Sequence, residues 1–175
     1  MSKKSILGLV ISLGLLPLVS LAANERDLNK LRELQKTTQS TQLDLSNADL
    51  RGYPFLPGKI DLREANMSHS NLAGVNLSKM NLASVDLSYA DLSHAKLNQV
   101  NLADANLTHA NLTGTELMQS DLSRANLTCA NLNEANLSKS IFTQANISGA
   151  SLVNTVTTDS VGYESAQDSA IQCDG

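Results

Sequence analysis

The sequence predicts an all-β protein built as a solenoid, in which the chain winds into stacked coils. Three observations indicate this class: a five-residue repeat that runs without a gap from residue 60 to 154, a leucine at the third position of most repeats, and an aromatic content of only 3%. Because there is no Trp and few other large rings, repeated small and medium aliphatic side chains must fill the interior. A chain of 175 residues suffices for one such domain.

The period of five decides between the regular structures. The 19 pentads of residues 60–154 read small residue, Asn or Asp, Leu, polar, polar, and the third position, here called the centre, departs from Leu only at Met67, Phe142 and Ile147. On an α-helix, five residues advance about 500°, so the leucines would wind around every side. On a flat strand, the small residue and the Leu share a face, but the next small residue falls on the other one. The chain must therefore turn a corner in every pentad, with coils stacked about 4.8 Å apart.

Pentads such as Ala105-Asn-Leu-Thr-His and Ala125-Asn-Leu-Thr-Cys resemble the pentapeptide-repeat family. The resemblance covers residues 60–154, and two further pentads, centred on Leu45 and Leu50, lie in residues 43–52. It implies a right-handed quadrilateral β-helix with four pentads per coil, and thus just under five coils. Many members carry a Cys pair in the segment before the first coil. This chain has no such pair, so no metal or disulfide role of that pair transfers.

The N-terminus has the layout of a secretory signal peptide, assigned to residues 1–22. Lys3 and Lys4 precede an uncharged apolar run, and Ser20 and Ala22 satisfy the small-x-small rule for cleavage after Ala22. The alternative is a retained membrane anchor, since 6–23 just reaches the length of a spanning helix. The mature chain would carry a formal charge of −6, with 11 basic and 17 acidic residues, which makes nucleic acid a poor partner.

The remaining segments follow from the pattern. Residues 23–42 place leucines at helical intervals among charges, which predicts a short N-terminal capping helix over the first coil. The solenoid is assigned to residues 43–154, with an insertion near 53–59, because Leu50 and Leu62 are two residues further apart than two pentads require. Residues 155–175 lose the pattern and are predicted to form a polar C-terminal tail.

The recurrent Asn, Asp, Ser and Thr residues are interpreted as structural rather than catalytic. They recur in every coil, where they would stack, and the Asn and Asp side chains can hydrogen-bond the backbone of the corners. With four pentads per coil, every fourth pentad shares a wall, and one corner column holds residues of other types: His69, Tyr89, His109, Cys129 and Gly149. Its two histidines lie two coils, about 9.6 Å, apart, whereas two nitrogens on one zinc each lie about 2.1 Å from it. We therefore expect no metal, no cofactor and no catalytic residue, and a non-enzymatic protein.

Two further site predictions remain. Cys129 and Cys173 would lie in an oxidising compartment after export, so we expect them to form a disulfide that holds the tail; free thiols or an intermolecular bridge are the alternatives. Tyr53 and Phe55, stiffened by Pro54 and Pro57, interrupt the repeat and could form a partner-binding loop. Alternatively, Phe55 is an inward centre five residues after Leu50, with Tyr53 covering the first coil.

These observations predict a periplasmic or secreted scaffold that presents a rigid surface to a protein partner, as a monomer or an end-to-end dimer, with no membrane span once the signal is removed. Two alternatives stay open. One is a DNA-mimicking inhibitor of a type II topoisomerase, as in some relatives, but that requires a cytoplasmic location. Such relatives favour Phe at the centre, whereas this chain has Leu, and residues 60–154 carry only −3. The other is a purely structural envelope protein.

Overall fold

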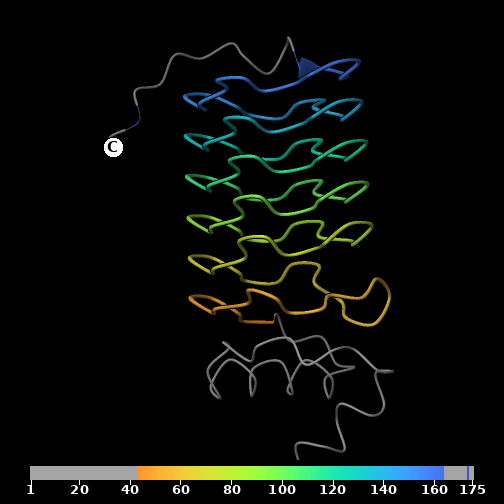
Figure 1. Cartoon of the computed structure of the whole chain (residues 1–175), viewed down its shortest axis with the longest axis vertical. Coiled ribbons are helices and arrows are strands. Elements are labelled where there is room, and N and C mark those ends of the chain that lie inside the picture. The colour runs from red at the N-terminus through yellow and green to blue at the C-terminus, as the bar shows by residue number, and fades with distance from the viewer. Residues whose placement is uncertain (1–42, 164–172, 174–175) are drawn as a thin grey trace, which may run out of the picture.

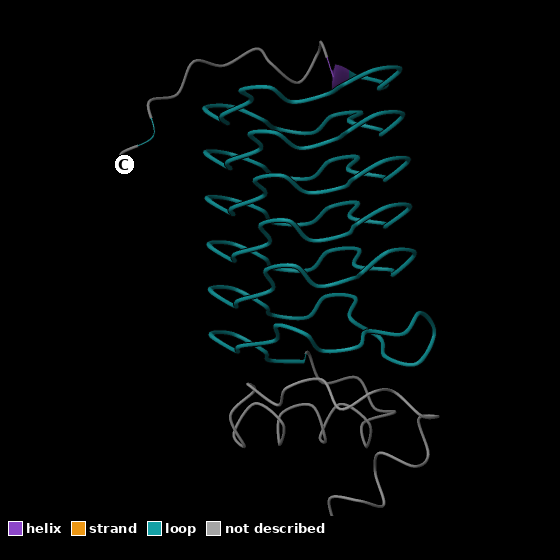
Figure 2. Cartoon of the chain, in the orientation of Figure 1, coloured by secondary structure: helices purple, strands orange, loops and turns teal. Residues whose placement is uncertain are grey.

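The computed structural model describes residues 43–163 and Cys173. The predicted signal peptide (1–22), the predicted capping helix (23–42) and most of the C-terminal tail lie outside these residues. Figures 1 and 2 show one continuous stack of coils. Regular strands are too short to be drawn as arrows, because each one forms a single parallel bridge to the coil above and below. Within residues 43–163, no helix is long and apolar enough to cross a membrane.

The register of the stack is four pentads per coil. Parallel bridges join Asn66 to Asp86, Asp86 to Asn106, and Asn106 to Asn126, and the same step recurs on the other sides. The number of pentads in a coil is therefore the one that the resemblance implied. We number the four walls by the centres of one coil, which are Leu82 for wall 1, Leu87 for wall 2, Leu92 for wall 3 and Leu97 for wall 4.

Each corner between two walls is a β-turn whose third residue is left-handed. At one corner the amide of Ala110 donates to the carbonyl of Leu107 at 3.0 Å, and His109 between them has φ +57°. A positive φ at the third position alone defines a type II turn. The fifth residue of the pentad therefore always occupies the strained position, and among residues 43–163 it is a residue other than glycine at 18 corners.

Backbone hydrogen bonds between coils stabilise this stack on every wall. The amide of Leu107 donates to the carbonyl of Asn126 at 2.7 Å, and the amide of Asn126 returns a bond to Ala105 at 2.9 Å. The side chain of the residue before the centre then holds the corner: Asn106 Oδ1 accepts from the amide of Thr108 at 3.2 Å, and its Nδ2 donates to Asp86 one coil below at 3.0 Å. The Asn and Asp residues thus bond the corner backbone, as their recurrence indicated.

The core is a single column of aliphatic side chains. Every centre from Leu45 to Ile147 is buried, and so are the small residues two positions earlier, such as Ala105 and Ala125. Buried polar residues at that small position bond the turns: the hydroxyl of Ser120 donates to the carbonyl of Leu97 one coil below at 2.6 Å. No buried side-chain oxygen or nitrogen in the described part of the chain lacks a partner.

The insertion lies at one corner of the first coil. The bridges Asp44 to Asn66 and Asp49 to Asn71 span more residues than every other bridge of the described chain. The extra residues therefore lie in the first coil, between Asp49 and Asn66. Phe55 takes the centre position of wall 4, and the extra length falls in residues 56–59, which form the loop that projects from the lower coils in Figure 1.

The coil extends further than the sequence pattern indicated. Val156 bridges Asn136, and Val161 bridges Ile141, so residues 155–163 continue the stack where a polar tail was predicted to begin. The pattern is lost there because the centres are no longer leucine. The small-position residues nevertheless keep their role, since the hydroxyls of Thr155 and Ser160 bond carbonyls one coil below at 2.7 and 2.8 Å.

Two glycines in the same corner column allow the free-energy cost of a side chain at the left-handed position to be measured with and without a steric clash. Gly74 (φ +68°) has open space where a Cβ would lie, whereas a Cβ on Gly114 (φ +64°) would lie 2.6 Å from His94 Nδ1. Gly74→Ala is expected to lower the free energy of unfolding by about 1 kcal/mol through backbone strain alone. Gly114→Ala should cost more, because the imidazole must also move. Chemical denaturation of both variants measures the difference.

The control is the same pair of substitutions in a His94→Ala background. The excess cost of Gly114→Ala should disappear there, since the clashing ring is gone. Equal costs for the two glycines in the wild-type background would contradict the contact between His94 and Gly114.

Candidate functional site

The corner between walls 2 and 3 carries a stack of three aromatic rings. The centroids of His69 and Tyr89 are 4.9 Å apart with planes inclined by 4°, and those of Tyr89 and His109 are 4.8 Å apart with planes inclined by 10°. The spacing equals the rise of the coil, so the rings stack because their backbone positions repeat in register. Aromatic pairs contribute about 0.5–1.5 kcal/mol beyond their burial.

The backbone holds these rings rigidly in place. All three residues occupy the left-handed corner position, with φ between +57° and +58°. The amide of His69 donates to Ser88 at 2.9 Å, and the amide of Tyr89 donates to Thr108 at 3.0 Å, so each ring is carried on backbone bonded to the next coil. The Tyr89 side chain is 53% exposed. The edges of the rings are therefore presented to solvent in a fixed row.

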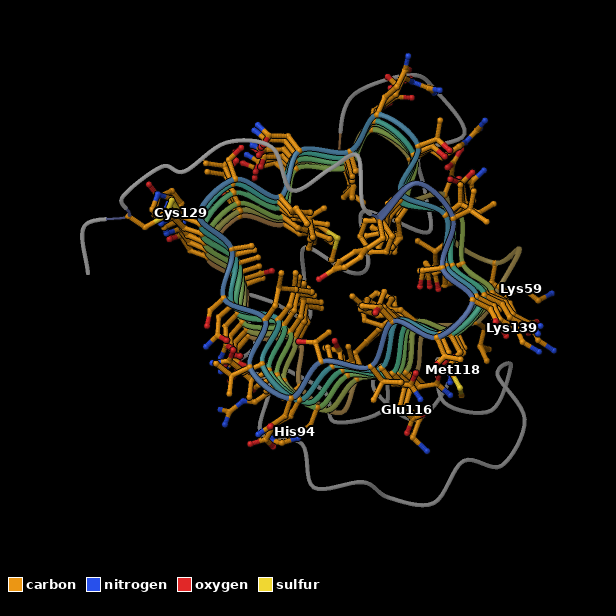
Figure 3. The ribbon with its side chains drawn as sticks, turned by 90° about the horizontal axis from the view of Figure 1, so that it is seen from above. Lys59, His94, Glu116, Met118, Cys129 and Lys139 are labelled. Atoms are coloured by element: carbon orange, nitrogen blue, oxygen red, sulfur yellow. A yellow bond between two sulfur atoms is a disulfide. The ribbon has the colours of Figure 1, made fainter. Side chains whose placement is uncertain are left out.

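The next residue of the column is Cys129, which lies directly after His109 in the stack. It is bonded to Cys173 in a disulfide with a Cα–Cα distance of 5.7 Å. The sulfur of Cys173 lies 3.4 Å from the carbonyl oxygen of Gly149, the following residue of the same column. The structure thus joins Cys173 to the same corner column that carries the rings, and Figure 3 shows Cys129 at this corner.

The chemistry available to this corner is recognition through ring edges and hydroxyl groups. The faces of Tyr89 are both occupied by imidazoles, so a ligand can reach only ring nitrogens and the phenol. His69 and His109 lie on either side of Tyr89, too far apart for one ion. No group of three or more His, Cys, Asp or Glu side chains in residues 43–163 is arranged to hold a metal.

The structure does not place Tyr53 and Phe55 in an exposed loop, as the predicted partner-binding role required. Phe55 is only 5% exposed and belongs to the core, and Tyr53 packs against it with ring centroids 4.7 Å apart in an edge-to-face arrangement. Burial also raises the pKa of the Tyr53 phenol above its usual value. The alternative, in which Phe55 is an inward centre covered by Tyr53, is correct, because the position five residues after Leu50 faces the core.

Sequence reasoning did not identify Tyr89 as an interaction residue. It placed His69, Tyr89 and His109 in one column but treated them only as possible metal ligands. Of the phenylalanines and tyrosines that the structure describes, Phe55 and Phe142 are buried, Tyr53 and Tyr163 are half-buried, and Tyr89 alone is exposed. The signal available in sequence was the identical spacing of three aromatic rings, four pentads apart, at the outward corner position.

The chain belongs to the pentapeptide-repeat family. The family described as "Pentapeptide repeats (8 copies)" matches residues 60–99, 86–124, 101–138 and 120–156, which together cover more than half of the 175 residues. The fold of this family is the right-handed β-helix, in agreement with the stacked coils. No curated protein matches the chain.

Several solved structures of pentapeptide-repeat proteins are similar to this chain. A protein of the Arabidopsis thaliana thylakoid lumen is 32% identical over 51% of this chain and 59% of its own length, with a TM-score of 0.38. A protein from Nostoc PCC 7120 is 24% identical over 71% of this chain and 93% of its own, with a TM-score of 0.43. Trypsin-treated QnrB1, a plasmid-mediated fluoroquinolone resistance protein, is 16% identical over 73% of each chain, with a TM-score of 0.36.

Proposed function

We propose that the chain is a non-enzymatic scaffold, exported to the periplasm or secreted, that binds a protein partner through the corner stack of His69, Tyr89 and His109. The observation that carries this proposal is the exposed Tyr89 ring, held between two parallel imidazoles. Tyrosine is enriched at the energetic centres of protein interfaces. A ring that is already immobile loses little conformational entropy when a partner binds, so its contact area contributes more to affinity.

The surroundings of the stack also suit a protein partner. Wall 2 beside it carries Ser and Thr side chains after each centre, and Ser68 and Thr108 both donate to Asn Oδ1 at 2.7 Å. These hydroxyls form a regular polar rim around an aromatic centre, which is the usual anatomy of an interface. The export that we propose rests on the layout of residues 1–22.

Tyr89→Ala is expected to abolish capture of the partner, because it removes the exposed ring at the centre of the site. The experiment compares the proteins retained from a periplasmic extract by immobilised wild type and by the variant. Truncation of an interface centre costs about 2 kcal/mol or more, which is a loss of about 30-fold or more in affinity. The melting temperature should fall by only a few degrees, since the side chain is half in solvent.

Ser84→Ala is the matched control, because Ser84 occupies the same left-handed corner position, with φ +58°, at the corner between walls 1 and 2. It should capture the same proteins as the wild type. A protein retained equally by wild type, Tyr89→Ala and Ser84→Ala does not bind at the stack, and if all retained proteins behave in this way the proposal is wrong.

The charge distribution does not favour the rival function of DNA mimicry. A mimic needs a strongly acidic surface along its whole length. Residues 43–163 carry 11 carboxylates and seven basic side chains, and one of the four walls is basic. Leucine also occupies 16 of the 19 centres of residues 60–154, where the mimicking relatives favour phenylalanine.

A further inference from the structure

The charges of the solenoid are segregated among its walls. All four lysines of residues 43–163 belong to wall 4 or its outer corner, where they face two carboxylates, so this wall has a net charge of +2. Each of the other three walls has a net charge of −2. The charged residues of wall 4 are Lys59, Lys79, Lys96, Lys139, Glu116 and Asp159.

The lysines differ from the arginines in their partners. Each arginine of the described range forms an ion pair with an aspartate, at 2.6 to 2.7 Å, and these pairs are Arg51 with Asp49, Arg63 with Asp61, and Arg124 with Asp104. The guanidinium hydrogen bonds lower the pKa of all three carboxyl groups, so the pairs stay charged and neutralise each other.

None of the four lysines forms an ion pair with a residue of the described chain, and all four are exposed. The Glu116 carboxylate on the same wall accepts a hydrogen bond from Asn98 Nδ2 at 2.8 Å instead. The positive charge of wall 4 is therefore available to an external partner.

The geometry of the wall limits what that partner is. Lys59 and Lys139 lie at one corner, diagonally opposite the corner of Cys129 (Figure 3). Lys79 and Lys139 are three coils apart in the same column, which is about 14 Å along a straight edge. Between them, Gln99 and Gln119 bond each other at 3.0 Å. Lys79 and Lys139 extend from one straight edge of wall 4 and Lys96 extends from the wall itself, so these side chains can reach one plane together.

The amino-acid composition of wall 4 favours a lipid surface over a protein as its binding partner. Protein interfaces are enriched in Arg and aromatic residues and depleted in Lys. Wall 4 has four lysines, no arginine and no exposed aromatic ring. Lysine clusters of this kind are attracted to anionic phospholipids, with about 1 kcal/mol for each side chain near the surface. The acidic wall opposite, wall 2, lies across the core and faces away from any surface that wall 4 contacts.

We propose that wall 4 and its lysine corner dock the solenoid onto the surface of a bilayer that contains anionic phospholipids. In this orientation the corner stack of His69, Tyr89 and His109 faces away from the bilayer, because it lies at the diagonally opposite corner. The docking surface is distinct from the proposed protein-binding site, and either proposal can fail without the other.

The test measures binding of the full chain to vesicles of phosphatidylcholine alone and of phosphatidylcholine with one quarter phosphatidylglycerol, by co-sedimentation at low salt. The ratio of the two partition coefficients reports attraction to headgroup charge, and binding through the apolar N-terminal stretch contributes to both. The triple variant Lys59→Gln, Lys79→Gln, Lys139→Gln is expected to lower this ratio on the order of 100-fold, since each lysine contributes a factor of about five.

The matched control is Arg51→Gln, Arg63→Gln, Arg124→Gln, which removes the same three positive charges from walls 1 and 3. Because those charges are already paired, and lie on other walls, this variant should keep the wild-type ratio within about threefold. Replacing the three lysines by arginine should restore binding. Thermal melts establish that every variant folds.

Equal losses in the lysine and arginine triples would overturn the proposal, because net charge alone would then explain the binding. A wild-type chain with no preference for anionic vesicles would also overturn it. Salt-sensitive binding to duplex DNA in that case would assign wall 4 to nucleic acid instead.

Discussion

Leu107→Ala is expected to lower the free energy of unfolding by about 2–5 kcal/mol. Leu107 is a centre of wall 2 in the middle of the stack, with 0% of its side chain exposed. The loss combines the transfer free energy of the removed methyl groups with the cavity that remains, and the hydrogen-bonded coils above and below restrict the collapse of that cavity. Denaturant unfolding followed by circular dichroism measures the change.

Two variants of neighbouring residues provide the controls for this prediction. Ala105→Phe should also destabilise the protein, by about 1–3 kcal/mol, because Ala105 is 1% exposed and the coil cannot widen around a larger ring. Thr108→Ala, after the centre, faces outward and should stay within about 0.5 kcal/mol of the wild type. If all three proteins melt alike, the assignment of inward and outward positions is wrong.

Loss of the disulfide between Cys129 and Cys173 is expected to lower the free energy of unfolding by about 2–4 kcal/mol. The bond closes a loop between residues 44 positions apart, and such a loop restricts the unfolded chain by about 4 kcal/mol in the loop-closure model. The measurement compares thermal melts with and without reductant.

The double variant Cys129→Ser, Cys173→Ser is the control, and its melting temperature should not respond to reductant. Mass spectrometry of the unreduced, digested protein identifies the linked peptides directly. Two free, alkylated cysteines in the exported protein would contradict the pairing, as would a wild-type melting temperature that reductant leaves unchanged.

Much of the fold followed from the local repeat, because the residue types within each pentad determine which side chains face inward and where the chain turns. Leu107 is buried and His109 occupies a corner for reasons that lie within one pentad: the small residue and the leucine must face inward, and the next two residues must turn. The continuation through residues 155–163 was missed because Thr157 and Gly162 replace the usual leucine at the centre, and Val156 and Val161 replace the usual Asn or Asp before it. The bridges persist because they depend on the backbone alone.

The candidate site was harder to predict, because it depends on positions that are four pentads apart in the sequence. The column of His69, Tyr89 and His109 followed from counting four pentads per coil, but parallel stacking and the exposure of Tyr89 did not. Phe55 was assigned to a binding loop as well as to the core. The structure decided between these because the extra length of the chain falls in residues 56–59, and Phe55 is buried in the core with the other centres.

By itself, the sequence determined the coil, its inward leucines and its Asn and Asp ladders, since these arise from contacts within one pentad or from the same contact repeated in every coil. Only the tertiary structure decided which outward residues act together. Within the described residues, it stacked the three rings at one corner, placed Cys173 beside Cys129, left the four lysines of wall 4 without an ion-pair partner, and paired each arginine with an aspartate. The physical reason is that side-chain contacts between coils depend on register and on rotamers, and neither is encoded within a single five-residue repeat.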